Sequence, residues 1–120
     1  MSIKFDYAEM IWYEIKEAIE HERVALLPVA TYEDHGPHLP VDVDVVLCNE
    51  ICRRAAARIP SEVVLVPPVN HGYSPHHMDF HGTITIRWDT FINYVKDVCC
   101  SLAYHGFKRI LIINGHGSNT

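Results

Sequence analysis

Six side chains that can bind a metal ion fall within twelve residues near the start of the chain: Glu33, Asp34, His35, His38, Asp42 and Asp44. Carboxylate and imidazole groups at this density suit a divalent transition metal such as zinc or manganese. Taken alone, the same stretch fits a solvated acidic loop with incidental histidines about equally well. The position of this loop relative to the rest of the chain therefore has to decide between the two interpretations.

Two further polar loops support the metal interpretation. They follow two other predicted strands and carry Ser74, His76, His77, Asn114, His116 and Asn119. The carboxyl ends of parallel strands share one edge of a sheet, and ligands bind in the crevice there. Chance explains one polar loop easily and three on one edge poorly. The sequence therefore favours a metal site for His35 and His116, whereas His21 and His105 are better explained as surface or hydrogen-bonded residues.

Three continuous apolar runs predict the strands that end in these loops, over Val24–Ala30, Val63–Val69 and Lys108–Asn114. Continuous rather than alternating apolarity is typical of strands covered by helices on both faces. A short further strand is predicted over Thr83–Arg87. The predicted fold class is therefore α/β with a parallel sheet.

Helical spacing of apolar residues predicts the segments that connect and cover the strands. One helix is predicted from Tyr7 to about Glu20 after a cap at Asp6, and a second from Asp44 to just before Pro60. The third runs from an N-cap at Asp89 to about His105, with Gly106 placed to end it in a left-handed conformation.

Composition and charge exclude several classes of function. A length of 120 residues allows one domain at most. The net charge of −5 argues against nucleic acid or an anionic membrane as a partner, since both favour a basic surface. No apolar run approaches the length of a membrane span, and the N-terminus lacks the apolar core of a signal peptide. We therefore expect a cytoplasmic protein without a membrane partner.

The cysteines fit the same compartment. They fall within two predicted helices, as Cys48, Cys52, Cys99 and Cys100. They are best interpreted as small buried hydrophobic residues in a reducing cytosol. A zinc pair formed by Cys48 and Cys52 is the weaker alternative, because no second pair has suitable loop spacing.

Three stretches of the chain resemble motifs of the creatininase family: residues 33–40 together with Asp44, residues 72–84, and residues 114–119. The resemblance runs from about Val24 to the last residue and is specific for the family, not for a substrate. The family includes creatinine amidohydrolase, a formamide deformylase of flavin and deazaflavin synthesis and a peptidase of mycofactocin maturation. A flavodoxin-like binding domain is disfavoured, because the loop after the first strand is acidic and not a glycine-rich phosphate loop.

The resemblance implies a three-layer α/β/α domain of which residues 1–120 form the N-terminal half. It also implies a metal-dependent hydrolase that uses a metal-activated water to cleave a non-peptide amide C–N bond of a small molecule, for example in a cyclic or formyl amide. A non-catalytic metal-binding or assembly subunit of such an enzyme is the alternative. Two divalent ions are implied, with zinc first and manganese or iron as alternatives.

The resemblance also assigns roles to individual residues. Glu33 and His116 would bind one ion and His35 the other, with Asp44 bridging the two. Expected substrate contacts are Ser74, His77 and His81. The catalytic proton donor is expected in the C-terminal half, with His77 as the candidate within this chain.

Two residues and the chain length depart from the family pattern. Ser118 stands where the creatininase proper has a glutamate that binds the second ion, which therefore needs a ligand from elsewhere. His81 replaces the usual proline and adds an imidazole that could line the pocket. Family members are roughly twice this length, so we expect a C-terminal half, as a second chain or as a segment lost by cleavage or truncation. The uncovered sheet edge further predicts association, including a homo-oligomer.

Overall fold

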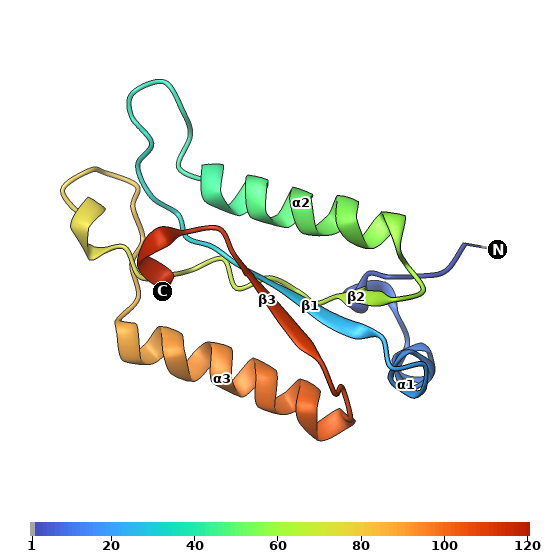
Figure 1. The fold of residues 1–120 in the computed structure, drawn as a ribbon. Coiled ribbons are helices and arrows are strands. Elements are labelled where there is room, and N and C mark those ends of the chain that lie inside the picture. The colour runs from blue at the N-terminus through green and yellow to red at the C-terminus, as the bar shows by residue number, and fades with distance from the viewer. Residues whose placement is uncertain (1) are drawn as a thin grey trace.

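The computed structural model describes residues 2–120 and contains a three-stranded parallel sheet with helices on both faces (Figure 1). The central strand β1 (Val24–Val29) lies between β2 (Val63–Leu65) and β3 (Ile110–Asn114). Ala25 of β1 lies opposite Val64 on one side and Ile110 on the other. The predicted α/β class and parallel sheet are therefore confirmed.

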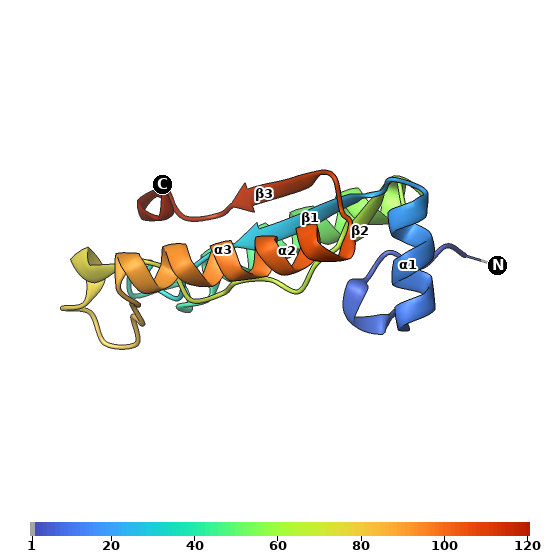
Figure 2. The same cartoon turned by 90° about the horizontal axis from the view of Figure 1, so that it is seen from below.

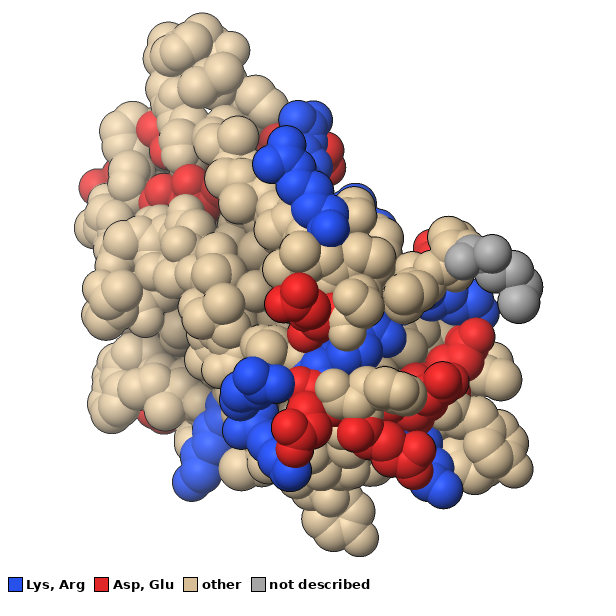
Figure 3. All heavy atoms as spheres, turned by 45° about the vertical axis from the view of Figure 1, so that its right-hand side comes forward, with Lys and Arg blue, Asp and Glu red and all other residues tan. Residues whose placement is uncertain are grey.

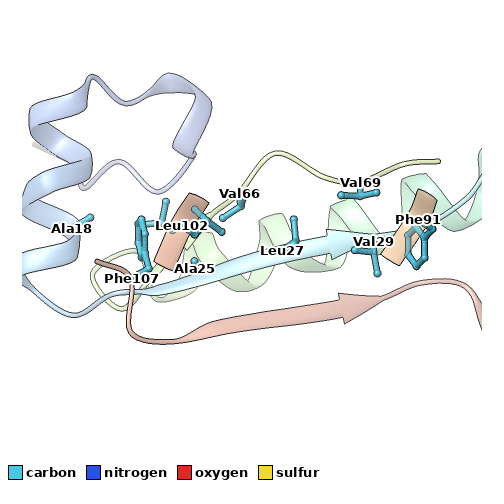
Figure 4. Packing of buried hydrophobic residues seen from close by; sticks show 10 residues of the cluster. Ala18, Ala25, Leu27, Val29, Val66, Val69, Phe91, Leu102 and Phe107 are labelled. Carbon is cyan, nitrogen blue, oxygen red and sulfur yellow. The ribbon is translucent and has the colours of Figure 1, made fainter. Parts of the chain in front are cut away.

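Three α-helices cover this sheet: α1 (Trp12–Glu20), α2 (Val43–Arg58) and α3 (Trp88–His105). Helix α2 packs on one face, while α1 and α3 pack on the other (Figures 1 and 2). Alternate residues of β1 point to opposite faces, so each layer of helices has its own apolar core. One core joins β1 to α1 and α3 and includes Ala18, Ala25, Leu27, Val29, Phe91 and Leu102 (Figure 4). The other joins β1 to α2 and includes Leu26, Ala30, Val45, Cys48, Cys52 and Ala56.

The second strand is shorter than predicted. Regular pairing ends at Leu65, not at Val69, because Pro67 and Pro68 have no N–H group to donate to a neighbouring strand. A single bridge between Val69 and Val29 continues the alignment. The predicted strand over residues 83–87 is likewise reduced to one bridge, between Ile84 and Tyr32.

Two helix starts also differ from the prediction. Asp6 does act as a cap, but of a separate 3-10 turn over Tyr7–Glu9, and α1 begins only at Trp12. The carboxylate of Glu14 fixes this start by accepting a hydrogen bond of 2.9 Å from the N–H of Ile11.

In α3 the N-cap is Arg87, not Asp89, which lies in the first turn of the helix. The other end of α3 is as predicted, because Gly106 closes it with a φ of 112°.

The two edges of the sheet differ. The N-terminal segment covers β2, where Leu65 donates a 2.7 Å hydrogen bond to the carbonyl of Phe5. The buried guanidinium of Arg23 holds the same segment by donating to the carbonyls of Lys4 and Val63, both at 2.7 Å. Strand β3 has no partner on its outer side among residues 2–120, so its edge is open.

The surface carries no dominant charge of one sign on the face that Figure 3 shows. Lysine, arginine, aspartate and glutamate side chains are intermixed over one part of this face, and a broad area beside them has few charged groups (Figure 3). In the part of the chain that the structure describes, no helix combines the length and the apolar character needed to cross a membrane.

Candidate metal centre

Four loops and helix ends meet at the carboxyl edge of the sheet (Figure 1). Glu33 and His35 follow β1, Asp44 lies in the first turn of α2, and His116 follows β3. His77 comes from the 3-10 turn η2 (Pro75–His77), which follows β2. The four side chains predicted to bind metal come from two separate motifs, and they lie in one cluster with His77 of the motif over residues 72–84.

His116 presents one ring nitrogen to two carboxylates. Its Nδ1 lies 3.1 Å from Oε1 of Glu33 and 3.1 Å from Oδ2 of Asp44. Its Nε2 lies 3.1 Å from the backbone carbonyl of Tyr73, which can only accept a hydrogen bond. Nε2 is therefore placed to donate to this carbonyl, which leaves Nδ1 as the nitrogen that faces both carboxylates.

His35 repeats this arrangement. Its Nδ1 is placed to donate to the carbonyl of Glu33 at 3.2 Å, and its Nε2 lies 3.1 Å from Oδ1 of Asp44. Metal-binding histidines characteristically donate their second nitrogen to such a carbonyl, which fixes the tautomer and aims the other nitrogen at the ion. Both histidines therefore have the orientation that a metal ligand needs.

Glu33 is the most constrained member of the cluster. It is only 7% exposed, and its Oε2 has no hydrogen-bond partner among residues 2–120. Burial, followed by the adjacent carboxyl of Asp44, raises the pKa of Glu33 above its usual range. A bound cation would offset both effects, because it compensates for lost solvation and removes the repulsion between the carboxylates.

The donor set therefore fits a divalent ion on observations of this chain alone. Two carboxylates and two imidazoles converge with lone pairs directed inward. Glu33, His35 and Asp44 each offer one donor atom, and these three atoms lie within 4.8 Å of one another. Mixed imidazole and carboxylate ligands suit zinc and neighbouring transition metals, whereas oxygen-only sites suit magnesium or calcium.

Side-chain hydrogen bonds hold the loops in place around this cluster. The Oδ1 of Asn119 accepts a hydrogen bond from the N–H of Tyr73 at 3.0 Å, and its Nδ2 donates to the carbonyl of Ala30 at 3.2 Å. Asn119 therefore links the loops after all three strands. Gly115 lets this assembly close, because a Cβ atom built there would lie 2.6 Å from the Cβ of Cys48 on α2.

The predicted substrate contacts have different surroundings. Ser74 is fully buried, and its Oγ lies 2.8 Å from Oγ1 of Thr31 and 3.1 Å from Nε2 of His116. In this arrangement Ser74 positions the ring of His116. His81 is exposed, while His77 is part of the cluster, with its Nε2 3.4 Å from Oε2 of Glu33. Their roles toward a substrate remain predictions.

One residue of this edge received no role from the sequence. His76 precedes His77 in the 3-10 turn η2, and its ring is stacked with that of His116 at a centroid distance of 6.0 Å. The only sequence signal was its position in the polar loop. The 3-10 turn η2 brings the ring of His76 beside the cluster, and the spacing of residues along the chain does not predict this turn.

The fold and this cluster together define an α/β protein with a carboxylate–histidine cluster that fits a divalent metal ion at the carboxyl edge of its sheet. The family model described as creatinine amidohydrolase matches residues 8–120. The chain therefore belongs to the creatininase family.

Three relatives show the range of proteins that the chain resembles. It is 32% identical to the creatinine amidohydrolase of Pseudomonas putida over all of its own length and 48% of that protein. It is 29% identical to a 3-dehydro-scyllo-inosose hydrolase of Thermotoga maritima, over 92% of the chain and 35% of the relative. It is 33% identical to a mycofactocin precursor peptide peptidase of Mycolicibacterium smegmatis, over 80% of the chain and 40% of the relative. The chain thus spans less than half of each relative.

Solved structures agree with the sequence comparison. A crystal structure of creatinine amidohydrolase matches with a TM-score of 0.91 and 32% identity, over 99% of this chain and 48% of that one. A creatininase described with Mn and a mutant described as the Zn-Zn type each match with a TM-score of 0.90 and 32% identity. The match to the Mn form covers 98% of this chain and 47% of that chain. The match to the Zn-Zn form covers 99% of this chain and 48% of that chain.

Proposed function

We propose that this chain provides the metal-binding half of a binuclear metal-dependent hydrolase that cleaves an amide C–N bond. The observation that carries the proposal is the convergence of Glu33, His35, Asp44 and His116, with both histidines held by backbone carbonyls. Family membership supports it, since relatives are named amidohydrolase, hydrolase and peptidase.

Asp44 is proposed to be the residue shared between two ions. One of its carboxylate oxygens faces His35 and the other faces His116, each at 3.1 Å. A carboxylate with one imidazole on each oxygen can serve two positions at once. Zinc or manganese is the proposed ion type, in keeping with the Zn-Zn and Mn forms named among the structural relatives. When bound, such a pair of ions supplies Lewis-acid activation of a water and of the amide carbonyl.

The residues of this chain would orient and hold that chemistry. The carbonyl of Tyr73, 3.1 Å from Nε2 of His116, would orient this ring so that Nδ1 faces the ion. Ser74 and Thr31 hold the ring in the same orientation from the buried side. A bound cation would favour the ionised form of Glu33, whose pKa is raised by burial and by the adjacent carboxyl of Asp44. Positioning of this kind lets the centre act without rearranging during the reaction.

The substrate class is proposed as an amide in the general sense. The names of the relatives include both an amidohydrolase and a peptide peptidase, so the narrower expectation of a cyclic or formyl amide stays a prediction. The cytoplasmic location also stays a prediction. All four cysteines are free, as that location requires.

We further propose that the open edge of β3 receives the remainder of the fold, from this polypeptide or from a second chain. Leu111 and Ile112 on this strand are 51% and 43% exposed, which is unusual for consecutive large apolar residues of a strand. Beside them, a groove of about 500 Å³ between α3 and β3 is lined by apolar side chains that include Phe91, Val95 and Ile112. An added strand and helix would bury this surface, and a second copy of the chain would do so in a homo-oligomer.

Metal analysis combined with an activity assay tests the function. The purified protein, with any chain that copurifies and is identified by intact mass, would be assayed for bound zinc and manganese and for amine release. The substrates would be a cyclic amide, a formamide and a short peptide. Wild type should bind up to two ions at Glu33, His35, Asp44 and His116 and cleave at least one amide, and Asp44→Ala should lose both ions of this centre and the activity. Two full metal equivalents retained in Asp44→Ala would contradict the shared role of this carboxylate.

A further inference from the structure

A second group of donors lies next to the four proposed metal ligands, Glu33, His35, Asp44 and His116, and shares only Glu33 with them. Donor atoms of Glu33, His76 and His77 lie within 4.8 Å of one another. The two histidines are consecutive in the 3-10 turn η2, and their ring centroids are 4.4 Å apart at an interplanar angle of 61°. The turn therefore directs both rings toward the same carboxylate.

The Oε2 atom of Glu33 points into this second group. Oε1 faces His116, whereas Oε2 lies 3.4 Å from Nε2 of His77 without forming a hydrogen bond among residues 2–120. A buried carboxylate oxygen without a hydrogen-bond partner destabilises the fold unless a cation or donor compensates it. Two donors bound to one zinc ion at about 2.1 Å in a tetrahedron are about 3.4 Å apart. The spacing between Glu33 and His77 thus matches that of two ligands of one ion.

His76 occupies the open side of this group. Its Nε2 lies 3.4 Å from Oγ of Ser118 in the turn after β3, and its ring is exposed. Ser118 has no charge and a short side chain, so it leaves room for the imidazole and does not neutralise a cation. An ion can therefore reach this position from solvent. Among the three donor residues, only the carboxylate of Glu33 supplies negative charge.

We propose that Glu33 Oε2, His76 and His77 form a further binding position for a divalent transition-metal ion, next to the four-residue centre. Two imidazoles and one carboxylate select zinc, cobalt or nickel over magnesium and calcium. Glu33 then spans both positions, with Oε1 toward His116 and Oε2 toward His77. The assignment rests on the metal centre of the proposed function, and it makes His77 a ligand in place of the proton donor predicted from sequence.

Zinc titration against a competing chelator, with metal content measured by mass spectrometry, tests the assignment. We would compare metal-stripped wild type with His76→Ala, His77→Ala and the control His71→Ala, which removes an exposed histidine from the same loop. His76→Ala and His77→Ala should each bind the ion at this position at least about a hundredfold more weakly. His71→Ala should match wild type. Because His76 is exposed, its removal should leave the unfolding temperature of the metal-free protein unchanged.

A spectroscopic readout makes the test more specific. Cobalt-loaded wild type should show a visible absorption band that His76→Ala reduces. Wild-type zinc content and affinity in both histidine variants would overturn the proposal, and so would loss in His76→Ala alone. A wild type that binds no transition metal would instead refute the metal centre of the proposed function.

Discussion

Substituting Gly115 by alanine should weaken metal binding without touching a ligand. Gly115 lies in the turn between β3 and His116, and its backbone packs against α2 one helical turn beyond Asp44. An alanine Cβ would lie 2.6 Å from the Cβ of Cys48 and 3.2 Å from the carbonyl oxygen of Asp44. The first neighbour is attached directly to the helix backbone, so no side-chain rotation can relieve the clash.

The size of the effect follows from these distances. Restoring an ordinary contact of 3.4 Å requires the turn and the helix to separate by about 0.8 Å. The same displacement would lengthen the 3.1 Å contact between His116 and Asp44 to about 3.9 Å. Metal ligation tolerates only about 0.2 Å. We therefore expect zinc affinity to fall about 10–100-fold, as when a ligand's supporting partner is lost, and unfolding free energy to fall by about 1–3 kcal/mol.

Gly117 provides the matched control. It lies in the same turn two residues later, and a Cβ built there meets nothing within 4 Å. Gly117→Ala should therefore bind zinc like wild type in the same chelator competition, with an unchanged denaturant midpoint. Equal zinc affinities for Gly115→Ala and Gly117→Ala would show that the close packing of the turn after β3 against α2 does not set the distance between His116 and Asp44.

Three further predictions follow from the cores, the cysteines and the open edge. Leu27 has no exposed surface, so Leu27→Ala should lower the free energy of unfolding in denaturant by about 2–5 kcal/mol. Tyr104 is 88% exposed, so Tyr104→Ala should change this free energy by less than about 0.5 kcal/mol. Similar losses in both variants would contradict the assigned core. Burial raises the pKa of Cys52 to about 12. At pH 8 Cys52 should therefore react with iodoacetamide about a thousandfold more slowly than the exposed Cys100, measured by peptide mass mapping over time. Comparable rates would mean that α2 opens readily. Leu111→Lys should weaken association in sedimentation velocity because it places a charge on the open strand, and an unchanged sedimentation coefficient would place the interface elsewhere.

The elements of the fold were predictable because their signals are local. Continuous apolar runs marked the strands, since strands buried on both faces tolerate no polar position. Gly106 marked the end of α3 through its freedom to take a positive φ. The errors came where two local signals competed. Asp89 was preferred as a cap by residue type, yet the chain turned into α3 two residues earlier at Arg87. The apolar run to Val69 outweighed the two prolines that end regular pairing at Leu65.

The candidate site was predictable in composition and not in geometry. The sequence by itself determined that Glu33, His35, Asp44 and His116 lie at strand and helix ends, and the parallel arrangement brings such ends to one edge. Only the tertiary structure decided which atoms face each other. It set Nε2 of His116 against the carbonyl of Tyr73, buried Ser74 behind that ring, and left Oε2 of Glu33 beside His76 and His77. These outcomes depend on contacts between loops more than forty residues apart, and spacing along the chain does not encode the direction of a side chain in space.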